Sequence, residues 1–426
     1  MQEVQHGIGI ELYKESDMIK IIDGGVTSPK GFLAAGLRAG IKEGKTNKDM
    51  AMIRSKEPAV FAGTFTRNKV TAAPVQWDKA VLQKGGPVQA VVVNTGVANA
   101  ATGEEGFLNS RRTAEEAGKE LDIPAEEVLV ASTGVIGFQL PMDKILKGVG
   151  LLKDALSDTR EAALDAAEAI LTTDTHKKEI AVSFEIDGVT CTLGGMSKGS
   201  GMIHPNMGTM LCFLMTDAKI RQEVLQKILR EVVDETYNMV SVDGDTSTND
   251  SVIVLANGMS GAAEIEGEGE ALDTFKEALM QVCTYLAKET ARDGEGATRL
   301  FTAHVTGAPD RDTARTLAKA IITSSLTKAA IFGRDANMGR LLCAMGYSGA
   351  EYEPMKVDVT MVSSAGSIKL VQNGAMPAFS EEEALKILSP EEITAEVEVH
   401  QGDAEATAWG CDLTYDYVKI NADYRS

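Results

Sequence analysis

Two strand-like segments joined by an Asp-Gly pair constrain the fold of this chain most strongly. Apolar residues alternate with polar ones over residues 180–186 and again over residues 189–193, and only Asp187 and Gly188 separate the two runs. An Asp-Gly pair between alternating runs is a strong signal of a two-residue β-hairpin turn. A hairpin requires antiparallel pairing, which argues against a doubly wound, all-parallel sheet.

Other periodic segments predict helices and further strands. Apolar residues recur at four-residue steps over residues 220–232 and in a three-four rhythm over residues 272–286, and each pattern predicts an amphipathic helix. Residues 210–215 form an unbroken apolar run typical of a buried strand, and alternation over residues 409–417 predicts a half-buried antiparallel strand. The expected fold class is therefore α/β, with mixed and antiparallel sheets covered by helices.

Charge and composition narrow the functional classes. The chain has 426 residues and a formal net charge of −20, which repels nucleic acid and anionic lipid, so we expect neither as a partner. The five cysteines show no C-x-x-C spacing and the five histidines no H-E-x-x-H or H-x-H grouping, so we expect no metal site. The sequence shows no signal-peptide pattern and no run near the ~18 apolar residues of a membrane span, so we expect a cytoplasmic protein.

One hydroxyl stands directly before the apolar run at residues 210–215. Thr209 follows Gly208, and a threonine at the start of a strand is ordinary, since Thr favours strands. The alternative is self-cleavage: the Thr209 hydroxyl attacks the Gly208 carbonyl, the peptide shifts from nitrogen to oxygen, and water hydrolyses the ester. Glycine leaves that carbonyl approachable. Cleavage would free an α-amine of pKa ~8 on Thr209, placed to act as general base for the hydroxyl of the same residue.

Two glycine-rich segments offer partners for such a nucleophile. STGVIG, residues 132–137, follows an apolar run, so the Thr133 hydroxyl and the Gly134 amide could both face a developing oxyanion; a plain strand-to-helix turn explains the pattern equally well. GGMSKGSGM, residues 194–202, lacks the G-x-x-x-x-G-K-[ST] pattern of a phosphate loop. Its lysine, Lys198, is better interpreted as a positive charge that binds a substrate carboxylate.

Several of the polar motifs, taken in order, resemble those of one known family. They are GGVTSPKGFLAAG, STGVIG, LTTDT, KGSGMIHPNMGTMLCFLMTDA, VDGDTSTND, RDGEGATR, GRDANMGR and the terminal INADYRS. In this combination the sequence resembles the ornithine acetyltransferase family of arginine biosynthesis, the bifunctional glutamate N-acetyltransferases/amino-acid acetyltransferases. The resemblance runs from about residue 20 to the last residue.

The resemblance implies a self-cleaving enzyme with an N-terminal threonine nucleophile. Its α chain would be residues 1–208 and its β chain residues 209–426, associated as an α2β2 heterotetramer. The acetyl group of N2-acetylornithine would pass to the threonine, ornithine would leave, and glutamate would take the acetyl group in a ping-pong reaction. No metal or cofactor is implied, although some members accept acetyl-CoA as a co-substrate.

The family's site residues transfer to this chain motif by motif. Thr209 is expected to be the nucleophile and Thr133 with Gly134 the oxyanion pair. The expected substrate contacts are Thr172, Lys198, Thr209, Glu295, Asn421 and Ser426. Acetylornithine presents a carboxylate for Lys198 and a distal ammonium for Glu295, although Glu295 read alone would be a surface charge in a glycine loop.

Three departures from the family pattern and two alternative functions stay open at this point. Gly208 stands where the family usually has Ala, Val97 where a polar residue is commoner, and Ser426 where Thr is frequent. The last two could shift substrate preference. An N-terminal-nucleophile amidase or aminopeptidase would share the threonine and the cleavage but pass the acyl group to water. A non-enzymatic binding protein would stay uncut.

Overall fold

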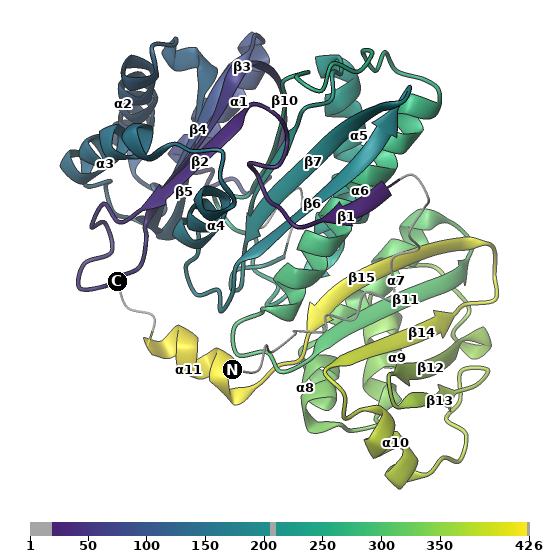
Figure 1. The fold of residues 1–426 in the computed structure, drawn as a ribbon. Coiled ribbons are helices and arrows are strands. Elements are labelled where there is room, and N and C mark those ends of the chain that lie inside the picture. Colours follow the sequence, from purple (N-terminus) through teal and green to yellow (C-terminus); the bar gives the residue numbers. More distant parts are fainter. Residues whose placement is uncertain (1–18, 205–209, 424–426) are drawn as a thin grey trace, which may run out of the picture.

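The structure, a computed structural model, describes residues 19–204 and 210–423 and contains two sheets in those residues (Figure 1). The nine-stranded sheet has the order β1-β6-β7-β8-β10-β3-β4-β5, with β2 paired to β3 beside this path. Its strands are β1 (Ile19–Ile22), β2 (Phe32–Leu37), β3 (Met50–Phe65), β4 (Val88–Val97), β5 (Val128–Val135), β6 (Lys178–Ile186), β7 (Val189–Lys198), β8 (Leu211–Thr216) and β10 (Ser251–Ala256).

The second sheet has six strands in the order β13-β12-β14-β11-β15-β9. They are β9 (Val240–Ser241), β11 (Leu300–Ala308), β12 (Asp358–Ser363), β13 (Gly366–Val371), β14 (Glu392–Glu398) and β15 (Ala404–Cys411). The helices are α1 (Ala73–Lys84), α2 (Gly103–Leu121), α3 (Met142–Ala155), α4 (Arg160–Ala169), α5 (Gln222–Glu235), α6 (Glu270–Arg292), α7 (Arg311–Thr323), α8 (Ser325–Gly333), α9 (Met338–Gly346), α10 (Glu381–Ile387) and α11 (Tyr415–Asp423).

The predicted hairpin is confirmed as β6 and β7. These strands pair antiparallel out to Ile186 and Val189, and the two turn residues have positive φ, 49° at Asp187 and 78° at Gly188. Positive φ at both positions is the geometry that Asp-Gly turns supply. The β8–β10 and β4–β5 pairs are parallel, whereas β7–β8 and β10–β3 are antiparallel, so the sheet is mixed and the predicted fold class is confirmed.

The apolar run before residue 216 is confirmed as the central strand β8, and burial on both faces explains its composition. Leu211, Phe213 and Met215 enter the apolar cluster that includes α1 and α4, whereas Cys212 and Leu214 enter the cluster built on α5 and α6. A strand with core on both sides has no solvated face, so its apolar residues run without alternation. Residues 211–216 are thereby fixed deep in the protein.

Helix α6 lies between the two sheets. It packs on β6 and β7 of the large sheet and on β15 of the small one, and the apolar cluster around it takes residues from both sheets. The predicted helices over residues 220–232 and 272–286 are confirmed as α5 and α6. Among the described residues, no helix combines the length and apolarity needed to cross a bilayer.

The strand predicted over residues 409–417 is wrong in its second half. Strand β15 ends at Cys411, because the Asp412 carboxylate accepts backbone N–H groups of Thr298 (2.8 Å) and Arg299 (3.1 Å) and turns the chain. Tyr415 and Tyr417 therefore lie on helix α11, not on a strand. The helix has no buried residue, and Figure 1 shows it projecting from the end of β15.

Candidate active site

The predicted site residues that the structure describes all line one cavity of about 160 Å³. They are Thr133, Gly134, Thr172, Lys198, Glu295 and Asn421. They come from β5, the loop after α4, the end of β7, the loop after α6, and α11, so segments far apart in the sequence converge there. Gly208, Thr209 and Ser426 lie outside the described residues.

Strand β5 brings Thr133 and Gly134 to the cavity beside the equivalent residues of β4. The two strands are parallel, and their register pairs Thr95 with Thr133 and Gly96 with Gly134. Gly134 has a φ of 128°, and a Cβ there would lie 2.3 Å from the carbonyl carbon of Gly96. Only glycine fits this conformation and this contact, which is a structural reason for the residue independent of any oxyanion role.

The ammonium of Lys198 lies beside the Thr133 hydroxyl. Lys198 ends β7 and is 7% exposed, and its Nζ donates to Oγ1 of Thr133 at 3.4 Å. Burial lowers the pKa of Lys198, an effect opposed by the Asp174 carboxylate and reinforced by the charge of Lys178. Because Lys198 donates to the Thr133 oxygen, the Thr133 proton is left to donate elsewhere. A hydroxyl donor backed by a cation is the arrangement that stabilises negative charge developing on a substrate oxygen.

The carboxylate of Glu295 forms another part of the cavity wall, and Gly201 makes room for it. A Cβ at Gly201 would lie 2.3 Å from the carboxyl carbon of Glu295. Glu295 is 9% exposed, and its Oε2 accepts from Nδ2 of Asn421 at 2.7 Å. Read alone, Glu295 suggested a surface charge; the structure instead places it against the cavity, where an acid can pair with a cationic group.

Helix α11 reaches the cavity through Asn421. The amide of Asn421 donates both to Glu295 and to the backbone carbonyl of Tyr417 (3.0 Å), and the Tyr417 hydroxyl donates to Asp243 at 3.3 Å. These polar contacts tie an otherwise exposed helix to the cavity.

Thr172 is held by a neighbouring carboxylate that sequence reasoning left without a role. Oδ2 of Asp174 accepts the Thr172 backbone N–H at 3.0 Å, with the Thr172 hydroxyl at 3.4 Å. Although burial alone would raise it, the charges of Lys178 and Lys198 hold the pKa of the Asp174 carboxyl well below its usual range. The motif LTTDT contained Asp174, but nothing in the local pattern showed that its side chain turns inward.

Asn249 is a second residue that sequence reasoning missed. Its Nδ2 donates to the carbonyls of Ala98 (2.6 Å) and Ser132 (2.8 Å), and it also lines the cavity. It thereby joins the ends of β4 and β5 next to Thr133. The motif VDGDTSTND marked the segment as polar, but its contact with residues more than a hundred positions earlier is a property of the fold.

The residues on either side of 205–209 also line the cavity. On the N-terminal side, the Asp243 carboxylate accepts the backbone N–H groups of Met202 (2.7 Å) and Ile203 (2.9 Å). On the C-terminal side, Met210 accepts the Ser251 N–H at 2.9 Å, and Leu211 pairs with Lys198. The predicted cleavage position is thus flanked by anchored residues of the cavity wall.

The donor set suits acyl chemistry on a small charged substrate. The half-buried Thr133 hydroxyl, the buried Lys198 ammonium and a carboxylate of opposite charge face a cavity of about 160 Å³. Among residues 19–204 and 210–423, no group of three or more His, Cys, Asp or Glu side chains is placed to hold a metal ion. These features fit an acyltransferase.

Comparison with known proteins identifies the family. The sequence profile described as the ArgJ family matches residues 33–426. The arginine biosynthesis bifunctional protein ArgJ of Caldanaerobacter subterraneus subsp. tengcongensis is 48% identical over 408 residues, covering 96% of this chain and all of that protein. The ArgJ of Symbiobacterium thermophilum is 50% identical over 408 residues, covering 95% of this chain and 99% of that protein. The chain belongs to the ArgJ family, and the predicted resemblance and enzyme class are confirmed.

Solved structures of related proteins match part of the chain. A crystal structure of the arginine biosynthesis bifunctional protein argJ from Bacillus halodurans is 43% identical, with a TM-score of 0.43, covering 44% of this chain and 97% of that one. The ornithine acetyltransferase of Mycobacterium tuberculosis, solved in complex with ornithine, is 40% identical, with a TM-score of 0.41, covering 44% of this chain and 98% of that one.

Proposed function

We propose that this chain cleaves itself between Gly208 and Thr209 and then transfers an acetyl group from N2-acetylornithine to glutamate through an ester on Thr209. The observation that carries the proposal is the convergence of Thr133, Lys198 and Glu295 on one cavity whose wall includes Met210, the residue after the nucleophile. No metal or cofactor takes part, and acetyl-CoA is an alternative acetyl donor. We place the reaction in the cytoplasm.

The first half-reaction forms the ester. The Thr209 hydroxyl attacks the acetyl carbon of acetylornithine and passes its proton to its own α-amine. The amide oxygen takes up negative charge and is stabilised by the Thr133 hydroxyl and the Gly134 N–H. The carbon–nitrogen bond then breaks, the proton moves to the departing ornithine amine, and the acetyl group stays on Thr209.

The second half-reaction reverses these steps with glutamate. The glutamate amine attacks the ester carbon, the bond to the Thr209 oxygen breaks, and that oxygen regains a proton. Lys198 binds the substrate carboxylate, and Glu295 binds the distal ammonium of ornithine. Exclusion of water is essential, because water would hydrolyse the ester. The small volume of the cavity and the burial of Lys198, Asn249 and Glu295 on its wall favour such exclusion.

Sheet topology supports a cleaved protein whose two chains stay together. Strands β8 and β10, which follow Thr209, lie between β7 and β3, which precede Gly208. Residues 1–208 and 209–426 therefore cannot separate without breaking the large sheet. We propose these ranges as the α and β chains, and two such pairs as the α2β2 assembly.

Gel electrophoresis tests the cleavage. The purified protein should show two fragments, each about half of 45.3 kDa, on a denaturing gel, and Thr209→Ala should leave the chain whole. Thr209→Ser keeps a hydroxyl and should still cleave. A wild-type protein that stays uncut would contradict the proposal.

Acceptor dependence tests the transfer. Consumption of acetylornithine should require glutamate and yield acetylglutamate in equal amount. If consumption is equally fast without glutamate, the enzyme is a hydrolase. Parallel assays with acetyl-CoA and acetylornithine as donors for glutamate decide which donor the enzyme uses.

A further inference from the structure

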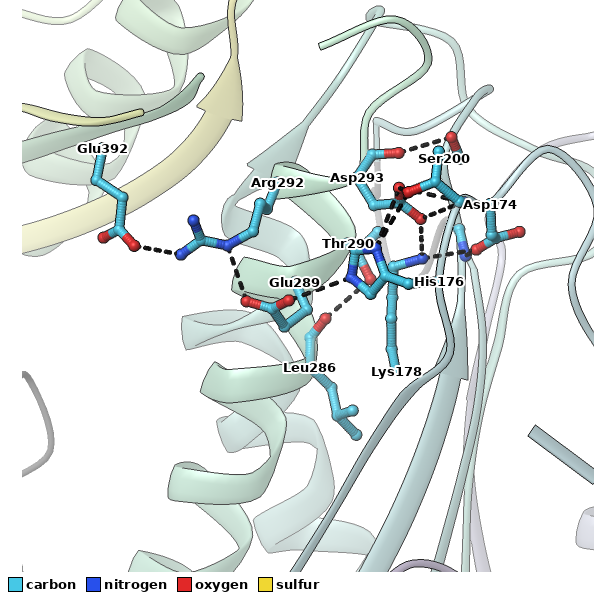
Figure 2. A network of polar contacts seen from close by, with 12 residues as sticks. Asp174, His176, Lys178, Ser200, Leu286, Glu289, Thr290, Arg292, Asp293 and Glu392 are labelled. Atoms are coloured by element: carbon cyan, nitrogen blue, oxygen red, sulfur yellow. Dashed lines mark hydrogen bonds and ion pairs between the residues drawn. The ribbon is translucent and has the colours of Figure 1, made fainter. Parts of the chain in front are cut away.

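A buried acid–base cluster lies directly behind the cavity. It consists of Asp174, Lys178 and Asp293, hereafter the Asp174 cluster, and Figure 2 shows the lysine between the two carboxylates. The side chains of Asp174 and Lys178 are fully buried, and that of Asp293 is 2% exposed. None of the three lines the cavity of about 160 Å³, so the proposed chemistry leaves them without a role.

Asp174 holds the two backbone segments that carry Thr172 and Lys198. Its Oδ2 accepts the Thr172 N–H at 3.0 Å, and its Oδ1 accepts the Gly199 N–H at 2.7 Å. Gly199 directly follows Lys198. A single carboxylate therefore fixes the positions of two cavity residues that belong to different segments of the chain, the loop after α4 and the end of β7.

Lys178 and Asp293 extend the same support to Glu295. Nζ of Lys178 donates to Oδ1 of Asp174 at 2.8 Å and also to Asp293. The backbone carbonyl of Asp293 accepts the Ser200 hydroxyl at 2.6 Å, and the Ser200 carbonyl accepts the Glu295 N–H at 3.0 Å. Thr172, Lys198 and Glu295 are thus all connected to one cluster.

The charges of the cluster and of Lys198 offset one another. Two carboxylates and two ammonium groups lie together, buried charges are tolerated when they are compensated, and Nδ1 of His176 also lies 3.5 Å from Oδ1 of Asp293. The other charged groups that act on Lys198 are Asp250 and Glu295 on the acidic side and Lys42 on the basic side. Removing the Asp174 charge would leave Lys178 with Asp293, and Lys198 with Asp250 and Glu295, as acidic neighbours.

We propose that Asp174 is a positioning residue for the acyl transfer, holding Thr172 and Lys198 at the cavity wall through the backbone N–H groups of Thr172 and Gly199 and supplying a buried negative charge that compensates the Lys198 ammonium. This proposal depends on the proposed function in one respect, the identity of the substrate as a small amino acid whose carboxylate binds Lys198. An uncharged amine at this position would bind a carboxylate poorly and would support the Thr133 hydroxyl less strongly, because a neutral donor makes a weaker hydrogen bond than an ammonium.

The experiment measures the titration of Lys198 directly. The protein is labelled with trace acetic anhydride across a pH series, and mass spectrometry gives the extent of Lys198 acetylation. In Asp174→Asn the labelling midpoint should fall by about one pH unit or more. The pH at which kcat/KM for acetylornithine declines on the alkaline side should fall by the same amount, with KM rising about tenfold while kcat changes less.

Two further variants separate positioning from simple loss of stability. Asp293→Asn removes the other partner of Lys178 and should lower the melting temperature similarly, but should leave the Lys198 midpoint in place. Asp174→Glu retains the negative charge, so its Lys198 midpoint should lie close to that of the wild type. This variant replaces Asp174→Asn in the experiment if Asp174→Asn does not fold.

An unchanged midpoint in folded Asp174→Asn would overturn the proposal, as would an equal shift in Asp293→Asn. If Asp174→Asn does not fold, Asp174→Glu gives the test. A fall of about one pH unit or more in its Lys198 midpoint would overturn the proposal too, because the Glu side chain keeps the negative charge. The labelling does not depend on catalysis. A wild-type protein without acetyl transfer would therefore refute the proposed function alone.

Discussion

Two regions of the cavity are built in different ways. Thr133, Gly134 and Lys198, hereafter the strand wall, stand on strands β5 and β7 of the large sheet, backed by apolar clusters on both faces. Asn421 stands on α11, a helix with no buried residue that contacts the cavity through side-chain hydrogen bonds. Rigid strands suit groups that must meet a transition state accurately, whereas an exposed helix can adjust to the substrate. Substitutions in the two regions should therefore have different consequences.

Gly134→Ala should have the largest effect, because it disturbs the strand wall itself. The added methyl group would overlap the Gly96 carbonyl, with a cost to the unfolding free energy of ~1–3 kcal/mol or more and loss of acetyl transfer. Thermal unfolding and steady-state assays measure the two effects.

Gly137→Ala is the matched control, since its φ is 92° but an added Cβ would meet no atom within 4 Å. Gly137→Ala should lower the unfolding free energy only by the cost of backbone strain. Equal losses in both variants would mean that the contact with Gly96 has no special role.

Thr133→Val should separate chemistry from stability within the same wall. Loss of the hydroxyl removes a proposed oxyanion donor, so kcat should fall by about 10²–10³-fold. The free energy of unfolding should fall by only about 1 kcal/mol, because a single hydrogen bond to Lys198 is lost.

Thr95→Val provides the control for this variant. Thr95 pairs with Thr133 across the β4–β5 ladder and donates to the Ala169 carbonyl at 3.2 Å, but it does not line the cavity. It should lower stability with little change in kcat. A large loss of kcat in Thr95→Val would show that general distortion of the ladder explains the Thr133 result.

Asn421→Ala should affect binding more than chemistry. The substitution removes the 2.7 Å contact with Glu295, and we expect KM for acetylornithine to rise several-fold, the equivalent of about 1 kcal/mol, with the melting temperature unchanged. Lys419→Ala on the same helix, whose side chain does not line this cavity, is the control. If Asn421→Ala lowered kcat as strongly as Thr133→Val, the contrast between the strand wall and α11 would be wrong.

Strands β6, β7 and β8 could be predicted from the sequence, because their signals are local. Asp187 and Gly188 set the β6–β7 turn through their own backbone preferences, and the apolar run of β8 records burial on both faces. Helix α11 was mistaken for a strand, because Tyr415 and Tyr417 continued an alternation that Asp412 interrupts through a contact with residues 298–299. Local patterns cannot contain such a contact.

The candidate site likewise contains some residues that the sequence could indicate and others that it could not. The motifs brought attention to Thr133, Lys198 and Glu295, and the structure places all three on one cavity. The Asp174 cluster could not be predicted, because its ion pairs join β6 and the loop before it to the end of α6, about 115 positions later in the chain. Charge compensation between distant segments leaves no periodic signal in the sequence.

The smallest expected effect lies outside both regions of the cavity, on the small sheet. His304 on β11 faces Glu396 on β14, with 2.6 Å between Nδ1 and Oε2, and Glu405 lies 3.8 Å from Nε2. The hydrogen bond to Glu396 raises the pKa of His304 above its usual value. A raised pKa in the folded state means that the pair stabilises the protein below the unfolded pKa of ~6.5, and that this contribution is lost as pH rises through the folded pKa.

His304→Gln should therefore lower the free energy of unfolding at pH 5 but hardly at pH 9. The loss should stay below about 1 kcal/mol, since both side chains are partly exposed and solvent screens the pair. Denaturant unfolding at the two pH values measures it, and Glu396→Gln should reproduce the same pH dependence. Acetyl transfer should be unchanged in both variants, because neither side chain is among the described residues that line the cavity. A loss of activity in either variant would extend the functional site to the small sheet.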